Sequence, residues 1–327
     1  MDPAHEWTDG EIEALERRMA REYGTAVREM RAKLDGFLKK YASELEAREK
    51  AMDDTPEARK ALEEWKRDRA ADRRWMEGMV RSLSADVQQA QARAMALVED
   101  LLPRIYAENA DFAAFEVDRA ARVDTAFTLM DEDTARQLMG EGRLMFEPPR
   151  PDAARVAAWT DRKVTGAVTQ GVLQGESVPH IAGRVAEVAD MSRRAAVRTA
   201  RTACTGAENA GRVSSYLRAQ RLGIQLRQEW LATLDMRTRD SHRLLDGERA
   251  AVGEEFSNGC RFPGDPQGPA AEVYNCRCTL VAAVDGVDQS AAARFDRLPD
   301  DMTYEEWRQE AKDRLDEKRK RMEGDNE

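Results

Sequence analysis

Apolar residues in the first fifty positions recur along a single narrow stripe. They follow one another at steps of three and four residues: Ile12, Leu15, Met19, Tyr23, Ala26, Met30, Leu34, Phe37, Tyr41 and Leu45. Spacing near 3.6 residues places side chains on one face of an α-helix. The pattern therefore predicts one long amphipathic helix.

A second long helix is predicted after the stretch DDTPEA at residues 53–58. Thr55 suits the N-cap, and Pro56 suits the first helical position, where a missing N–H costs nothing. The apolar stripe of this helix stops at Pro103, because an interior proline removes a backbone donor; its members are Met76, Val80, Leu83, Val87, Ala90, Ala94, Leu97 and Leu101. Together the two helices predict an antiparallel hairpin, or coiled-coil arm, over residues 1–102. We interpret it as a scaffold or partner surface.

The remaining chain predicts a mainly α protein with a small C-terminal α+β domain. Residues 103–222 continue as a helical domain, interrupted by Pro and Gly. Past Gly223 the chain alternates apolar and polar residues up to Trp230, which predicts a strand with one buried face. We assign residues 223–286 to the α+β domain, which closes with a strand containing NCRC, and residues 287–327 to a linker and helical tail. The tail starts at TYEE, a capping box from Thr303 to Glu306.

Composition limits the class of protein. Of the 327 residues, 35% are charged and the mean hydropathy is −0.71, so a single compact globule is not expected. No run approaches the roughly 18 apolar residues of a membrane helix, and no N-terminal signal pattern is visible. Four cysteines do not make a disulfide framework, which suits a reducing, cytoplasm-like compartment. The net charge of −10 argues against a general nucleic-acid coat.

Positive charge is concentrated between residues 193 and 249. This segment holds twelve Arg, no Lys and six acidic residues, a local excess of about +6 in an acidic chain. Arg194, Arg198 and Arg201 recur at helical spacing, so one helix face would present guanidinium groups suited to phosphate or carboxylate. We favour a solvated face with local ion pairs. Packaged DNA or an acidic protein partner remain open alternatives for these three residues.

Two cysteines stand one residue apart in VYNCRCTL, residues 273–280. If this stretch is a strand, Cys276 and Cys278 share a buried face with side chains roughly 6.5 to 7 Å apart. That spacing is too wide for a disulfide and wider than tetrahedral zinc prefers. His242 and Cys260 could complete a zinc set of three Cys and one His, but no Cys-x-x-Cys knuckle is present. We favour small buried thiols, and we expect no cofactor.

Two enzymatic interpretations remain open for the same region. A nucleophilic pair would use Cys276 and His242, with Asp246 or Asp235 as the orienting carboxylate. A metal-dependent nuclease would use Asp235, His242 and Asp246.

The favoured interpretation of these residues is structural. Asp235 and Asp240 then cap or close turns, His242 packs beneath Trp230, and Asp246-Gly247 forms a turn. Arg237 and Arg239 would clamp loop carboxylates that include Asp265.

Several motifs in order make the region from about residue 155 to 285 recognisable: ARTACTGAENAGR, EWLATLDMRTRDSHRLLDG and FPGDPQGPAAEVYNCRCTL. Together they resemble the phage head morphogenesis family, the minor head proteins like protein F of phage Mu. The residues that carry the resemblance are Trp230, Asp235, Arg237, Arg239, His242, Asp246, Gly247, Pro263, Gly264, Asp265, Pro266, Asn275, Cys276, Arg277 and Cys278. Many family members carry Glu after Arg-Thr where this chain has Ala203, so no polar role is carried over to that position.

The resemblance implies a structural protein rather than an enzyme, present in few copies near the portal of a tailed-phage or prophage head. Its expected location is the virion, after assembly in the bacterial cytoplasm. The implied partners are the portal protein and the inner capsid shell, with packaged DNA as a further candidate and no membrane contact. The hairpin arm lies outside the shared region. A metal-assisted hydrolase acting on DNA is the alternative function.

Overall fold

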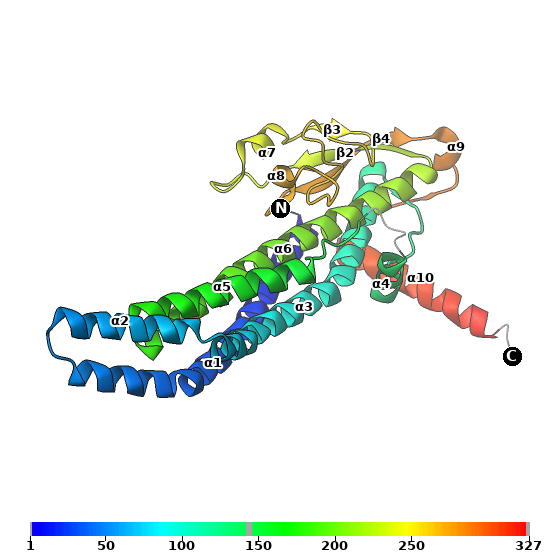
Figure 1. Cartoon of the computed structure of the whole chain (residues 1–327). Coiled ribbons are helices and arrows are strands. Elements are labelled where there is room, and N and C mark those ends of the chain that lie inside the picture. The colour runs from blue at the N-terminus through cyan, green and yellow to red at the C-terminus, as the bar shows by residue number, and fades with distance from the viewer. Residues whose placement is uncertain (1, 142–145, 325–327) are drawn as a thin grey trace. The chain divides into compact units, whose positions relative to one another are not determined.

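The computed structural model describes residues 2–141 and 146–324 (Figure 1). The helices are α1 (Pro3–Ala51), α2 (Pro56–Ala71), α3 (Arg73–Ala121), α4 (Glu132–Gly140), α5 (Ala153–Gln174), α6 (Val178–Arg221), α7 (Asp240–Leu244), α8 (Ala270–Val273), α9 (Gln289–Ala292) and α10 (Tyr304–Gly324). The strands are β1 (Val123–Asp124), β2 (Ile224–Leu231), β3 (Arg249–Ala250), β4 (Thr279–Val287) and β5 (Asp296–Arg297). The predicted class is confirmed: mainly α, with long N-terminal helices and a small C-terminal α+β part. None of the described helices is long and apolar enough to cross a membrane.

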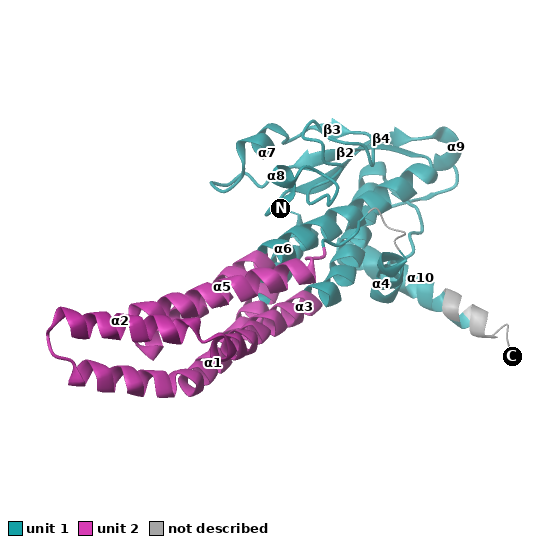
Figure 2. Ribbon diagram, viewed as in Figure 1, with its two compact units in different colours: residues 1–14, 98–149, 198–327 teal, residues 15–97, 150–197 magenta. Residues whose placement is uncertain are grey.

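Two compact units divide the chain (Figure 2). Unit 1 contains Met1–Ala14, Val98–Pro149 and Arg198–Glu327, and unit 2 contains Leu15–Leu97 and Arg150–Val197. Three of the four boundaries fall within helices, in α1, α3 and α6, and the fourth lies between Pro149 and Arg150 in the connection from α4 to α5. The domain limits given from the sequence, 1–102, 103–222, 223–286 and 287–327, stay a prediction, and the last three residues of that tail lie outside the described residues.

Unit 2 is a bundle of antiparallel helices. Glu22 pairs with Arg93 at 3.4 Å and Lys33 pairs with Asp86 at 2.5 Å. Since the partners on α3 come in reverse order, the two segments run antiparallel, as the sequence predicted. The stripe of α1 also meets the later helices of this unit, because the Tyr41 hydroxyl donates to the Val172 carbonyl on α5 at 3.0 Å.

The second predicted helix begins where expected, at Pro56 after the Thr55 cap, but its predicted continuity and its predicted end are wrong. It breaks at Asp72, whose extended backbone ends α2 and whose carboxylate accepts from the Trp75 amide at 3.2 Å to begin α3. It does not stop at Pro103, because α3 continues to Ala121. Leu102 and Ile105, which flank this proline on the buried side of the helix, are at most 1% exposed. We attribute the tolerance to this burial, which outweighs one lost backbone hydrogen bond.

The buried stripes also drift from the predicted residues. Leu38 is buried where Phe37 was expected, and Val98 and Leu102 are buried where Leu97 and Leu101 were expected. A straight α-helix turns once every 3.6 residues, so a heptad pattern slides by about 20° per repeat. The predicted steps of the second helix, from Met76 to Leu101, followed the heptad, whereas its buried face follows the straight helix.

Unit 1 contains a three-stranded antiparallel sheet in the order β3-β2-β4. Along β2 the residues alternate between buried and less buried positions, as predicted, with Ile224, Leu226, Gln228 and Trp230 facing inward. A second core of this unit gathers aromatic residues of α3 and α10, among them Phe112, Phe115 and Trp307. The predicted capping box is confirmed, since the Thr303 amide donates to Glu306 at 2.9 Å.

The bundle of unit 2 should depend on the inner face of α3. Leu83 is fully buried and Arg81 is exposed two residues earlier. Leu83→Asp places a charge in the bundle and should destabilise the protein by more than about 3 kcal/mol, whereas Arg81→Asp should stay within about 0.5 kcal/mol. Chemical denaturation followed by circular dichroism measures both. Equal effects would contradict the assigned face.

A partly buried histidine of unit 1 predicts sensitivity to alkaline pH. His5 contacts Glu208 at 2.8 Å; burial alone would lower the pKa of His5, but the carboxylate raises it to about 9. Because this pKa exceeds the ordinary value of 6.5, the stabilisation is complete below about pH 6.5 and disappears as pH rises through about 9.

The full chain should therefore lose up to about 3 kcal/mol of stability between about pH 6.5 and 9.5. His5→Gln should flatten that part of the pH profile, as measured by urea denaturation at several pH values. His180→Gln, at an exposed position of α6, is the matched control. A profile that His5→Gln leaves unchanged would show that this contact does not carry the dependence.

Candidate functional site

A row of polar side chains on α6 holds the chain segment that precedes β4. Thr205 donates to the Cys276 carbonyl at 2.9 Å, and Thr202 accepts from the Asn275 amide at 3.2 Å. Asn209 donates to the Cys278 carbonyl at 3.3 Å and accepts from the Leu280 amide at 2.8 Å. Every bond is to the backbone, so the helix fixes the path of the segment whatever side chains it carries.

The two cysteines of this segment do not lie on a strand. Asn275 adopts a left-handed conformation with φ of 56°, and β4 begins only at Thr279. The prediction of Cys276 and Cys278 within a strand is therefore wrong, and so is the wide spacing that followed from it. Their predicted burial is confirmed, since each is 2% exposed.

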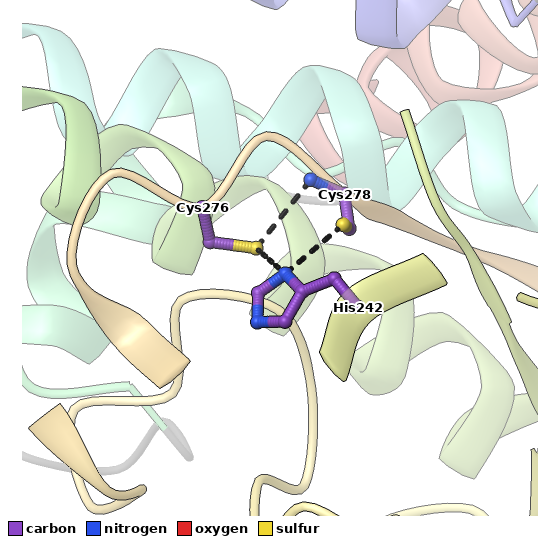
Figure 3. A group of neighbouring side chains, drawn as sticks. All are labelled: His242, Cys276 and Cys278. Carbon is purple, nitrogen blue, oxygen red and sulfur yellow. Dashed lines mark hydrogen bonds between the residues drawn. The ribbon is translucent and has the colours of Figure 1, made fainter. Parts of the chain in front are cut away.

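A compact cluster forms where this segment meets α7 (Figure 3). His242 of α7 points its Nδ1 atom at both sulfurs, at 3.6 Å from Cys276 Sγ and 3.4 Å from Cys278 Sγ. The ligand atoms of the three residues all lie within 4.8 Å of one another. The Cys278 amide also donates to Cys276 Sγ at 3.4 Å. Among the described residues, this is the only group of three or more His, Cys, Asp or Glu side chains that meets as a possible metal site.

The cluster is buried, and the pKa values of its two cysteines are shifted in opposite directions. The hydrogen bond between the two thiols lowers the pKa of Cys278, with help from His242, and raises the pKa of Cys276. On the far side of the ring, His242 Nε2 lies 3.0 Å from Glu272 Oε2, although the angle is outside that of a well-formed hydrogen bond. The ring also packs edge-on against Trp230 with centroids 5.4 Å apart, which confirms the predicted packing.

A pocket of about 240 Å³ opens beside the cluster. All three cluster residues line it. Four arginines line it as well: Arg201, Arg237, Arg239 and Arg277. Arg277 is engaged by Asp235 through two bonds of 2.6 and 2.7 Å, and Arg239 donates to the backbone carbonyls of Glu272 and Tyr274.

The motif containing Pro263, Gly264, Asp265 and Pro266 packs directly on α6. Gly264 has φ of +78°, and a Cβ built on it would lie 2.5 Å from the Gly206 amide nitrogen. Asp265 is bound by Arg261 at 2.7 and 2.8 Å. The predicted clamp on Asp265 by Arg237 and Arg239 is therefore wrong, because the arginine that binds Asp265 is Arg261, four residues earlier in the chain.

Cys260 is apart from the cluster. It is 1% exposed, and a Cβ built on Gly268 would lie 2.6 Å from its sulfur. Burial raises the pKa of Cys260 to about 12. Of the four residues considered for zinc from the sequence, the structure brings three together and leaves Cys260 out.

The carboxylates of the two enzymatic interpretations do not meet His242. Asp235 accepts from the Arg237 amide at 2.8 Å and closes a turn, as predicted, and Arg277 holds its pKa well below the usual range. Asp246 accepts from the Ala232 amide at 2.9 Å. The carboxylate beside His242 is Glu272, which the sequence did not single out because it lies thirty residues away on α8.

The three arginines singled out on α6 have different surroundings. Arg194, in unit 2, pairs with Asp190 at 2.7 Å. In unit 1, Arg198 is exposed and its guanidinium lies 5.9 Å from the centre of the Tyr274 ring, while Arg201 borders the pocket.

Sequence reasoning missed Arg212, Glu208 and Asn209. Arg212 is fully buried and donates to Asp2 at 2.6 Å, to Asn109 at 3.0 Å and to the Leu280 carbonyl at 3.0 Å. The stretch TGAENAGR could have indicated them, because its three polar residues stand among small residues that allow a helix to pack closely against other segments. Gly211 shows that closeness, since an added Cβ would lie 2.3 Å from the Tyr106 carbonyl oxygen.

The fold and the site together define a largely helical protein with a small α+β part fastened to one helix through its backbone. Residues 162–281 match the family described as Phage Mu protein F like protein. Minor head protein GP7 of Bacillus phage SPP1 is 24% identical over 316 residues, which cover 94% of this chain and 96% of GP7. These two matches support the resemblance to the phage head morphogenesis family that the motifs indicated.

Two further relatives match only in part. NAD(+)--arginine ADP-ribosyltransferase EFV of Enterococcus faecalis is 35% identical over 152 residues, 45% of this chain and 31% of that protein. The uncharacterized protein YqbB of Bacillus subtilis is 30% identical over 133 residues, 38% of this chain and 43% of YqbB. The matches thus span less than a third of EFV and less than half of YqbB. No solved structure matches the chain.

The contact between Gly264 and Gly206 should make Gly264 irreplaceable. Gly264→Ala should cost at least about 2 to 3 kcal/mol, because backbone strain and a steric clash add. Gly247 has the same φ of +78° but open space around it, so Gly247→Ala should cost only the strain, about 1 kcal/mol. Denaturant titration of both variants measures the difference. If the two costs were equal, close packing of this loop on α6 would be wrong.

Proposed function

We propose that this protein is a minor head protein of a tailed phage or prophage, placed near the portal and acting in head morphogenesis. Its partners are the portal protein and the inner capsid shell. It is assembled in the bacterial cytoplasm and becomes part of the virion. The observation that carries the proposal is the similarity to GP7, a minor head protein, over nearly the whole length of both chains.

The role is structural rather than enzymatic. Polar side chains of α6 hold the backbone of the α+β part, as the bonds of Thr205, Asn209 and Arg212 illustrate. The carboxylates needed for nuclease chemistry, Asp235 and Asp246, are bonded elsewhere. EFV is named for a transferase, but less than a third of it is matched, so its name supports no activity for this chain.

The contact surface proposed for an acidic protein partner is a set of three arginines: Arg201 and Arg237 of the pocket lining, and Arg198 one turn before Arg201 on α6. Arg198 and Arg237 are exposed, and Arg201 and Arg237 line the pocket. Guanidinium groups bind carboxylates in pairs of parallel hydrogen bonds. The chain carries a net charge of −10, which opposes long-range attraction to DNA, so we favour a protein partner over packaged DNA.

Replacing Arg198, Arg201 and Arg237 together with Ala tests this surface. The triple variant should fold, and its incorporation into phage heads should fall at least tenfold, because carboxylates on the partner lose their counter-charges. Incorporation is measured by quantitative mass spectrometry of purified heads. The matched control removes three exposed positive charges elsewhere, at Arg155, Arg162 and Lys163 of α5.

DNA affinity measured across salt concentrations distinguishes the partner classes. For a protein partner, both wild type and variant should bind DNA negligibly. If DNA is the partner, wild-type binding should weaken steeply with salt, and the triple variant should flatten the slope by about 2 to 3. Normal incorporation of the triple variant would refute the proposed surface.

A further inference from the structure

We propose that His242, Cys276 and Cys278 form a zinc-binding site, with His242 Nδ1 and the two sulfurs as its protein ligands. The ion would join α7 to the segment before β4. This site goes beyond the structural role in the head and does not depend on it.

The distances within the cluster fit tetrahedral zinc. Zinc binds thiolate sulfur at about 2.3 Å and imidazole nitrogen at about 2.0 to 2.1 Å, so a tetrahedral angle places nitrogen and sulfur about 3.6 Å apart. The observed separations from His242 Nδ1 are 3.6 Å to Cys276 and 3.4 Å to Cys278. The three ligand atoms surround one point, as Figure 3 shows, and all lie within 4.8 Å of one another.

The surroundings supply what zinc ligands need. A metal-bound imidazole commonly directs its other nitrogen at a carboxylate, which fixes the ring. Here His242 Nε2 is buried, and the carboxylate oxygen of Glu272 lies 3.0 Å away. The Cys278 amide donates to Cys276 Sγ at 3.4 Å, which helps to fix the position of that sulfur.

The site is also formed in advance by the fold. Thr205 and Asn209 fix the carbonyls on either side of Arg277, and the Thr233 hydroxyl donates to the Arg277 carbonyl itself. A chain held in this way loses little further entropy on binding an ion. The usual Cys-x-x-Cys turn is therefore unnecessary, because α6 and the Asn275 turn bring the two sulfurs together.

The fourth coordination position faces the arginine-lined pocket, since all three ligands line that pocket. Cys260 does not belong to the cluster. A water molecule or a small anion from the pocket would complete the tetrahedron. The nearby guanidinium groups of Arg239 and Arg277 suit an anionic occupant and two thiolates.

Metal analysis of the full-length protein tests the site directly. Protein purified without chelators should contain close to one zinc per chain. The metal-free protein should bind cobalt with a thiolate charge-transfer band and the intense visible bands of tetrahedral coordination. Cys276 and Cys278 should resist alkylation until a chelator is added, as mapped by peptide mass spectrometry.

Variants separate ligands from merely buried cysteines. Cys276→Ser and Cys278→Ser should each lower zinc affinity at least a hundredfold. Cys260→Ser changes an equally buried cysteine outside the cluster and should keep the metal. His242→Cys should also keep it, because a third thiolate can replace the imidazole, and this rescue would not follow from a role in packing alone.

Three results would overturn the proposal. The first is wild-type protein without zinc that also shows no cobalt charge-transfer band. The second is an intact mass lower by two hydrogens with a peptide linking Cys276 to Cys278, which would identify a disulfide. The third is equal zinc loss in Cys260→Ser and Cys276→Ser when both variants are folded by circular dichroism.

Discussion

The buried charge of Arg212 is the constraint on which the rest of unit 1 depends. The side chain is wholly inaccessible to water, so its guanidinium must find every partner inside the protein. It finds them on three other segments: Asp2 ahead of α1, Asn109 on α3 and the Leu280 carbonyl of β4. Moving Asp2 would remove a counter-charge, and moving Asn109 or Leu280 would leave buried N–H donors of Arg212 without acceptors; either change costs more than the loss of one apolar contact. The arginine therefore fixes the arrangement of four segments within this unit.

The geometry of the cluster of His242, Cys276 and Cys278 depends on α6, the helix that carries Arg212. Thr205, Asn209 and Arg212 are spaced four and three residues apart, so they lie on one face of α6 and bind successive backbone groups from Cys276 to Leu280. Because these contacts are to backbone atoms, the position of the segment does not depend on its own side chains. On this backbone both sulfurs face His242 of α7.

The sequence predicted the features that depend on neighbours along the chain. Helical periodicity, the Thr55 cap, the Thr303 capping box and the alternation along β2 are all local, and all are confirmed. Contacts between distant residues were predicted less well. The Arg261 bond to Asp265 was missed in favour of Arg237 and Arg239, and Glu272 was missed beside His242. The sequence placed the start of the last strand a few residues too early, so that it included both cysteines. Strand spacing was therefore applied to residues that lie before β4, and the predicted distance between the two sulfurs was wrong.

Polar residues inside a protein can be presented to a ligand or used to hold the chain, and here most of them hold the chain. Glu208 accepts from Thr279 and contacts His5, and Gln228 donates to the Glu254 and Arg261 carbonyls. An enzyme would need some of these groups left with bonding capacity directed toward a substrate. This use of buried polarity supports a structural role. It also marks the cluster on the arginine-lined pocket as a place in unit 1 where a histidine and two cysteines meet an open space.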